Sequence, residues 1–146
     1  MFYDIKVISP TGEEIIIDGK PDGTMADHIK RVYVKIDTVE ENQTTKATNV
    51  LNKVEIELQI NETTNGVCKD LMSWSLKSFG DDIYRTVHMD IYNTKKLIRS
   101  FDLKEMFVED CEEEYSKEAV DNGIFIIKLI QQSNKQKDFL HDVNQL

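Results

Sequence analysis

The sequence is poor in the residues that mark several common protein classes. Its 146 residues include two cysteines, two prolines and one tryptophan. Two cysteines cannot form the disulfide framework of a small secreted protein. No apolar run approaches the roughly 20 residues that a membrane-spanning helix needs, since the longest, at 124–130, is interrupted by Lys128. These shortages exclude a disulfide-stapled scaffold and predict no membrane partner.

Basic residues are also in short supply. The chain carries 18 Lys and Arg against 27 Asp and Glu, which gives a formal net charge of −9. A general nucleic-acid binder needs a basic face to release counterions from phosphates, so we expect no specific nucleic-acid binding. With 40% hydrophobic residues, the chain is too apolar for a disordered polymer. Length and composition together predict one acidic, compact domain.

The N-terminus lacks a basic segment followed by an apolar one, so it shows no classical secretory signal. Two N-x-T sequons, at Asn42 and Asn61, carry little weight without such a signal. We therefore expect synthesis in the cytoplasm, and a signal-independent route of export stays open.

Residues that carry catalysis or metal binding are scattered along the chain. The three histidines, His28, His88 and His141, form no close ligand pair such as H-x-H or H-E-x-x-H. Cys68 falls near the start of an expected helix, where the pKa of a thiol can be lowered, but no Cys-His motif accompanies it. Cys68 and Cys111 are both interpreted as small apolar fillers. The sequence predicts no enzyme, no cofactor and no metal site.

A run of acidic residues stands out at 109–114. It lacks the ligand spacing and the glycine of a calcium loop, and a strand would send successive carboxylates to opposite faces. We interpret the run as a solvated strand edge, because charge there discourages edge-to-edge aggregation.

Apolar and polar residues alternate along most of the chain, which is typical of strands with one buried face. Strands are predicted at 2–8, 13–17, 32–36, 54–60, 83–92, 96–101, 106–115 and 124–130. Arg85 is the one polar interruption of its strand. The last strand is nearly continuous in apolar residues and is predicted to be the most buried, covered on most of both faces. The pattern predicts a mainly β, antiparallel fold.

One helix is predicted between the fourth and fifth strands. It spans 66–78, has Asn65 as its N-cap and buries Trp74 against the core. We expect residues 1–132 to form a single domain and residues 133–146 to form a C-terminal arm or a short helix.

A polar segment at 40–49 separates two well-patterned strands. A hairpin needs only about two to five linking residues. The general behaviour of long polar loops favours a flexible surface connection, and the alternative is an arm that orders against a neighbouring subunit. The residues expected at such a subunit interface are Glu40, Glu41, Asn42, Gln43, Thr44, Thr45 and Lys46.

Two sequence motifs late in the chain resemble those of a known family. F-x-L-K-x-M-x-V stands at 101–108, the next strand ends at Tyr115, and G-x-F-x-I-x-L stands at 123–129. With the early long loop and the middle helix, this order resembles the tube-forming family that contains phage tail tube proteins and the haemolysin-coregulated protein of type VI secretion. The resemblance covers most of residues 28–131.

This resemblance implies an antiparallel β-sandwich or barrel whose subunits, usually six, form rings that stack into a hollow tube. The family has no active site to transfer. Its early long loop bridges adjacent rings, which assigns that role to the polar segment at 40–49. The implied partners are further copies of the chain together with sheath and baseplate proteins, and the product would be part of a particle or of an injected tube.

Two other functions stay open. A monomeric adaptor or inhibitor would use an acidic surface, including the run at 109–114, to bind a basic protein partner. A small hydrolase has the least support, because the sequence shows no nucleophile–base pair.

Overall fold

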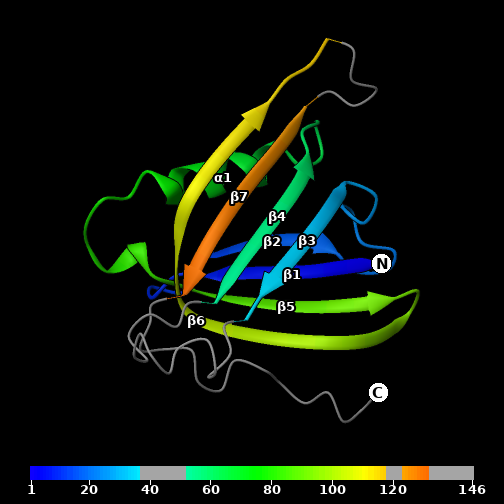
Figure 1. The fold of residues 1–146 in the computed structure, drawn as a ribbon, viewed down its shortest axis with the longest axis horizontal. Helices are drawn as coiled ribbons and strands as arrows, with labels where there is room; N and C mark the ends of the chain where they lie inside the picture. The colour runs from blue at the N-terminus through cyan, green and yellow to red at the C-terminus, as the bar shows by residue number, and fades with distance from the viewer. Residues whose placement is uncertain (37–51, 118–122, 132–146) are drawn as a thin grey trace, which may run out of the picture.

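A computed structural model of the chain describes residues 1–36, 52–117 and 123–131 (Figure 1). Its strands are β1 (Phe2–Ile8), β2 (Glu14–Gly19), β3 (Ile29–Lys35), β4 (Lys53–Gln59), β5 (Arg85–Asn93), β6 (Lys96–Glu114) and β7 (Ile124–Gln131). A helix, α1 (Asn65–Ser75), and a 3-10 turn, η3 (Asp81–Ile83), lie between β4 and β5. The prediction of a mainly β fold with one helix between the middle strands is confirmed. The polar segment at 40–49 and the C-terminal residues 133–146 lie outside the described residues.

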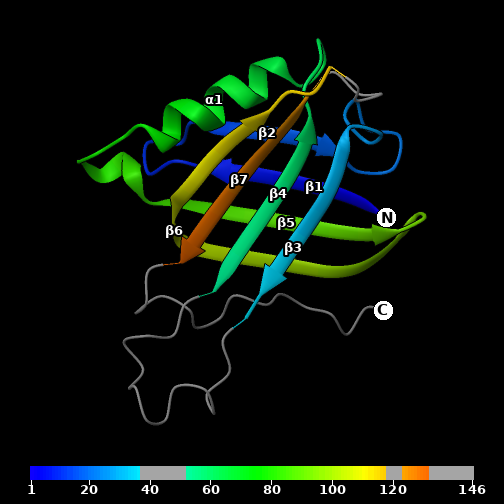
Figure 2. The ribbon, with the colours of Figure 1, turned by 45° about the horizontal axis from the view of Figure 1, so that its top comes forward.

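The seven strands form one antiparallel sheet in the order β2-β1-β5-β6-β7-β4-β3. Figures 1 and 2 show that the sheet folds over itself into two crossed layers. One layer contains β2, β1, β5 and the first part of β6, and the other contains the rest of β6 with β7, β4 and β3. β6 belongs to both layers because it pairs with β5 as far as Met106 and with β7 from Met106 onward. The fold is therefore a β-sandwich.

β6 is one strand of 19 residues, so the prediction of two strands at 96–101 and 106–115 is wrong. The strand bends at Glu105, whose φ of 58° lies in the left-handed region. There the register with β5 shifts between Arg85 and Val87, which marks a bulge. A bulge increases the local bend and twist, so the strand can cross from one layer to the other without ending.

A buried glutamine forms hydrogen bonds at the point where β6 passes from one layer to the other. Gln131, at the end of β7, is fully buried, and its Nε2 donates to the carbonyl oxygen of Lys104 over 3.0 Å. Its Oε1 accepts from Nδ2 of Asn52 over 2.7 Å, just before β4. Every polar group named here has a partner, so the network holds three strands together without an unpaired buried dipole.

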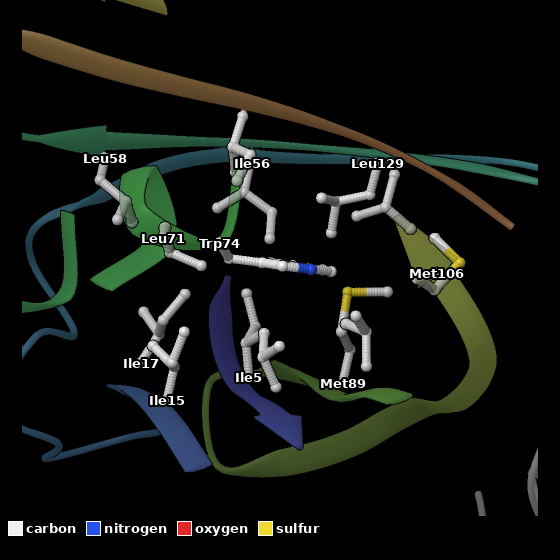
Figure 3. Packing of buried hydrophobic residues seen from close by; sticks show 14 of the residues in the cluster. Ile5, Ile15, Ile17, Ile56, Leu58, Leu71, Trp74, Met89, Met106 and Leu129 are labelled. Atoms are coloured by element: carbon white, nitrogen blue, oxygen red, sulfur yellow. The ribbon is translucent and has the colours of Figure 1, made fainter. Parts of the chain in front are cut away.

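The core lies between the two layers and is completed by α1. In Figure 3, Leu71 and Trp74 extend from the helix between the side chains of the two layers. The layers contribute mainly β-branched and long aliphatic side chains: Ile5, Ile15, Ile17 and Met89 on one side, and Ile56, Leu58, Met106 and Leu129 on the other. Each fully buried side chain of this size contributes about 1.5–3 kcal/mol to stability. The predicted burial of Trp74 is confirmed.

β7 has five buried residues, more than any other strand, which confirms the predicted rank. Its inward side chains Phe125, Ile127 and Leu129 are fully buried. Ile124 and Ile126 on the other side are only partly buried, so burial of most of both faces is not observed. The outward side chains stand on the outer surface of a two-layer sandwich, where no second helix among the described residues covers them.

The ends of two predicted elements differ from the sequence-based expectation. α1 has Thr64, not Asn65, as its N-cap, and it ends at Ser75 instead of residue 78. The side chain of Asn61 accepts from the backbone N–H groups of Thr63 and Thr64 over 2.9 and 3.1 Å, so the turn into the helix begins earlier. Ile83 belongs to η3 and not to a strand.

One glycine is required where the layers come together. A Cβ on Gly19 would lie 2.1 Å from the carbonyl oxygen of Tyr3 and 2.2 Å from Cδ1 of Ile29. The backbone of β1 at Tyr3 therefore leaves no room for a side chain at this position, whereas the flexible end of Ile29 could move aside. No helix in the described part of the chain is long and apolar enough to span a bilayer.

Candidate assembly surfaces

The predicted arm residues, Glu40, Glu41, Asn42, Gln43, Thr44, Thr45 and Lys46, lie outside the described residues. The structure does place the two ends of the segment that contains them. Lys35, at the end of β3, is paired with Lys53, at the start of β4. The described strand ends on either side of the segment are therefore neighbours in the sheet.

Two strands, β2 and β3, are the outermost strands of the sheet. On β3, Arg31 lies over the ring of Tyr33 at 5.1 Å and forms ion pairs with Glu55 and Glu57 at 3.5 and 3.2 Å. On β2, Ile16 is exposed. Unpaired backbone groups on edge strands accept further strands, so these edges are candidate contacts between copies of the chain.

The acidic run at 109–114 forms a third edge. Its residues pair with β7 on one side only, because pairing with β5 ends at Met106. Glu109, Glu112 and Glu114 are exposed. The interpretation as a charged strand edge is confirmed, and the charge opposes pairing with a further strand.

Three carboxylates lie in one row across the outer face of the first layer. Asp4 on β1 is paired in register with Asp18 on β2 and with Asp90 on β5. Like charges in directly opposed positions repel. Lys20 forms an ion pair with Asp18, and the hydroxyl of Ser100 donates to Asp90 over 2.7 Å. Burial, followed by the charges of Asp18 and Asp90, raises the pKa of Asp4, although Lys20 opposes the shift.

His88 extends this acidic surface. Its Nε2 lies 3.3 Å from Asp90 Oδ1 and its Nδ1 lies 3.9 Å from Asp102 Oδ1. Across the parts of the chain that the structure describes, no group of three His, Cys, Asp or Glu side chains is placed to hold a metal ion.

The two cysteines are not activated. Cys68 is buried in the core, and burial raises the pKa of its thiol to about 11. Burial is the largest cause of this shift, and the hydrogen bond with Thr64 only partly opposes it, so the pKa is not lowered at this helix start. Cys111 is half-buried, and burial raises its pKa as well. Both behave as the small apolar fillers that the sequence indicated.

Sequence patterns missed a buried charged site between α1 and β5. Arg85 has a side chain only 3% exposed, and its guanidinium lies 5.4 Å from the centre of the Trp74 ring. Its Nη2 donates to Asp82 Oδ2 over 2.9 Å. Nε1 of Trp74 donates to the carbonyl oxygen of Ile83 over 2.8 Å. The sequence signal for this site is Arg85 itself, a charged residue at a strand position where the alternation expects an apolar side chain.

Asp82 receives a second cation. Nζ of Lys77 lies 3.3 Å from Asp82 Oδ2, the oxygen that also accepts from Arg85. Burial acts to raise the pKa of Asp82, but the hydrogen bond and charge of Arg85, with those of Lys77, hold that pKa below its usual value. The carboxylate therefore stays ionised. Its ion pairs with Lys77 and Arg85 link the two ends of the connection at 76–84.

Comparison with known proteins identifies the architecture. No protein-family model matches the chain, and no curated protein matches it. Among solved structures, Hcp1 from Flavobacterium johnsoniae matches with a TM-score of 0.53 at 9% identity, over 90% of this chain and 94% of that one. Hcp1 from Salmonella typhimurium matches with a TM-score of 0.52 at 10% identity, over 88% and 81%. A further Hcp protein matches with a TM-score of 0.50 at 10% identity, over 93% and 96%.

The chain has the fold of Hcp proteins. The Hcp fold confirms the resemblance that the sequence showed, and it extends over more of the chain than the stretch at 28–131 that carried the resemblance. At 9–10% identity the similarity concerns the fold alone.

Proposed function

We propose that the chain is a structural subunit whose rings stack into the inner tube of a contractile phage-tail-like or secretion apparatus. The observation that carries the proposal is the Hcp fold over about nine-tenths of the chain. Hcp is the haemolysin-coregulated protein of the type VI secretion tube. In this role the chain has no catalytic activity and no cofactor, and its partners are further copies of itself with sheath and baseplate proteins.

The open edges of the sandwich support self-assembly. Among the described residues, β2 and β3 end the sheet order and pair with another strand on one side only, so each presents an edge strand to a neighbouring copy. A contact between two different surfaces is heterologous, and it closes into a ring when the rotation per subunit permits. We propose about six subunits per ring, as the resemblance implies.

We also propose that the segment at 40–49, including Glu40–Lys46, is an arm that contacts a neighbouring ring. The pairing of Lys35 with Lys53 supports it, because the two strand ends that flank the segment lie side by side and one of them belongs to an outermost strand of the sheet. Its polar composition suits a surface contact between rings better than the interior of the sandwich.

The acidic outer surface favours one alternative function. The row of Asp4, Asp18 and Asp90, together with the acidic edge at 109–114, would suit a monomeric adaptor or inhibitor that binds a basic protein.

Negative-stain microscopy of the purified full-length chain over a range of concentrations separates the two functions. The tube proposal expects rings, with stacked tubes at high concentration. Particles of single-domain size at every concentration would contradict it and favour the adaptor. A catalytic or metal-dependent assay is not needed to decide between them.

A further inference from the structure

We infer that Phe79 of one subunit inserts into a pocket at the opposite end of the next subunit, so that the ring closes through this head-to-tail contact. The inference rests on the proposed function, because it names the contact that would join neighbouring copies. It concerns the connection at 76–84, which no sequence pattern marked as functional.

Phe79 forms an apolar projection on this connection. Its side chain is 85% exposed, and that of nearby Leu76 is 77% exposed, so two large apolar groups face water within four residues. Figures 1 and 2 show the connection extending from the body of the sandwich beyond α1. Gly80, with φ of 99°, follows directly and turns the chain back toward η3.

The projection is held in place before any partner binds. The buried Arg85, Asp82 and Trp74 network fixes the returning strand, and Lys77 fixes the departing one through its ion pair with Asp82. The Arg85 guanidinium is buried, and its ion pair with Asp82 fixes the position of the residues just before β5. A rigid loop loses little conformational entropy on binding, so the arrangement suits a binding element.

The pocket lies at the far end of the sandwich and has a volume of about 370 Å³. It is formed by the start of β1, the connection from β2 to β3, and the turn from β5 to β6. Its apolar lining comes from Phe2, Pro21 and Ala26. Asp22 and Thr94, with φ of 67° and 58°, hold the two turns that form its walls. Asp adopts left-handed backbone more readily than most residues, but for β-branched Thr94 it is a genuine outlier. Strained backbone such as that at Thr94 is concentrated at functional sites.

The charges around the two surfaces are complementary. Lys77 stands two residues before Phe79 and is partly exposed. Two carboxylates, Asp22 and Asp27, and one ammonium group, Lys95, line the pocket and are exposed, so the lining has a net charge of −1. An inserted Phe79 would bring the Lys77 ammonium toward these carboxylates, which favours one orientation of the two subunits.

The location of the two surfaces selects a second copy of the chain as the partner. In Figures 1 and 2, which are related by a rotation about the horizontal axis, the connection at 76–84 lies at one end of the long axis and the β5–β6 turn and the start of β1 lie at the other. Phe79 therefore cannot fill its own subunit's pocket. Opposite ends that fit each other make a heterologous contact, the kind that generates rings, and a buried aromatic anchor is a frequent centre of binding energy.

The first test compares two exposed aromatic residues. Phe79→Ser should leave the melting temperature unchanged but abolish rings at concentrations where the native chain forms them. Tyr115→Ser is the matched control, because Tyr115 is also exposed, at 65%, but belongs to neither surface. The control should assemble like the native chain.

The second test crosslinks the two surfaces. The full-length chain with Phe79→Cys and Ala26→Cys, mildly oxidised, should give a ladder of disulfide-linked oligomers, because each subunit would carry both halves of the contact. Each single variant should give dimers at most, and the unsubstituted chain controls for Cys68 and Cys111. Rings from Phe79→Ser without a ladder from the double variant would overturn the inference and leave the tube proposal standing. A native chain that stays monomeric, together with a double variant that gives no ladder, would overturn both.

Discussion

At the residue scale, the informative positions are those that break the alternation of polar and apolar side chains. Arg85 stands where an inward apolar residue is expected, and Gln131 ends a strand of otherwise apolar inward residues. Each has partners that satisfy it, and each joins elements far apart in the sequence. The alternation of polar and apolar residues shows that such positions are unusual. It does not show which partners these side chains have, because the partners are set by tertiary structure.

We expect Arg85→Ala to lower the free energy of unfolding by about 3–5 kcal/mol, the usual cost of removing one partner of a buried ion pair. The substitution leaves Asp82 without its stronger cation and removes the group over Trp74. Urea unfolding followed by Trp74 fluorescence measures the change. Arg31→Ala, which removes a partly exposed arginine on β3, is the control and should cost about 1 kcal/mol or less. A loss below about 1 kcal/mol for Arg85→Ala would show that the anchor does not stabilise the fold.

Asp4 should make the protein less stable as the pH rises. Its folded-state pKa is raised, so the folded chain holds this proton more tightly than the unfolded chain does. The stabilisation is complete below the unfolded pKa, near 3.8, and is lost as the pH rises through the raised folded pKa. Asp4→Asn should therefore increase the melting temperature at pH 7 but not at pH 3. Glu62→Gln, at an exposed site, should change neither value, and an equal gain for Asp4→Asn at both pH values would contradict the account.

At the element scale, the sequence predicted strands better than it predicted their ends. β1 spans the predicted residues 2–8, because the turn that follows it is marked by Pro10 and Gly12. The sequence predicts two strands, at 96–101 and 106–115, where the structure has the single strand β6, and Lys104 and Glu105 lie in the stretch between the two predicted strands. In the structure they are a bulge within one strand, and a bulge has no distinctive pattern when its left-handed residue is not glycine.

The bulge makes a prediction about Glu105. Glycine adopts a positive φ without the penalty that a Cβ brings, so Glu105→Gly should raise the free energy of unfolding by about 0.5–1 kcal/mol. Glu112→Gly, in the ordinary part of the same strand, should lower it by a similar amount, about 0.5–1 kcal/mol. Chemical denaturation of both variants measures the two effects. A loss of stability in both would show that β6 is not strained at Glu105.

At the scale of the whole molecule, the fold could be predicted further than the surfaces. Apolar periodicity and element order led to the sandwich and to the resemblance, since both depend on the core. The exposure of Phe79 could not be predicted from periodicity, because a loop residue belongs to no repeating pattern of buried and exposed positions. The pocket around Pro21 and Thr94 could not be predicted either, since it joins three turns that come together only in the folded chain.

The polar segment gives a prediction about assembly. Replacing residues 40–49 with Asn-Gly should preserve the melting temperature, because Lys35 and Lys53 are already paired and a shorter loop costs less closure entropy. The variant should form single rings but no long tubes, as seen by electron microscopy. Long tubes from this variant would contradict the arm proposal, and loss of folding would place the segment in the core.

The mass of the native chain in solution tests the central claim most directly. Light scattering coupled to size-exclusion chromatography, at increasing protein concentration, should show a closed oligomer of about six times the 16.9 kDa subunit, or larger stacks of it. A constant mass of 16.9 kDa up to the highest soluble concentration would contradict the account of this chain as a ring-forming tube subunit.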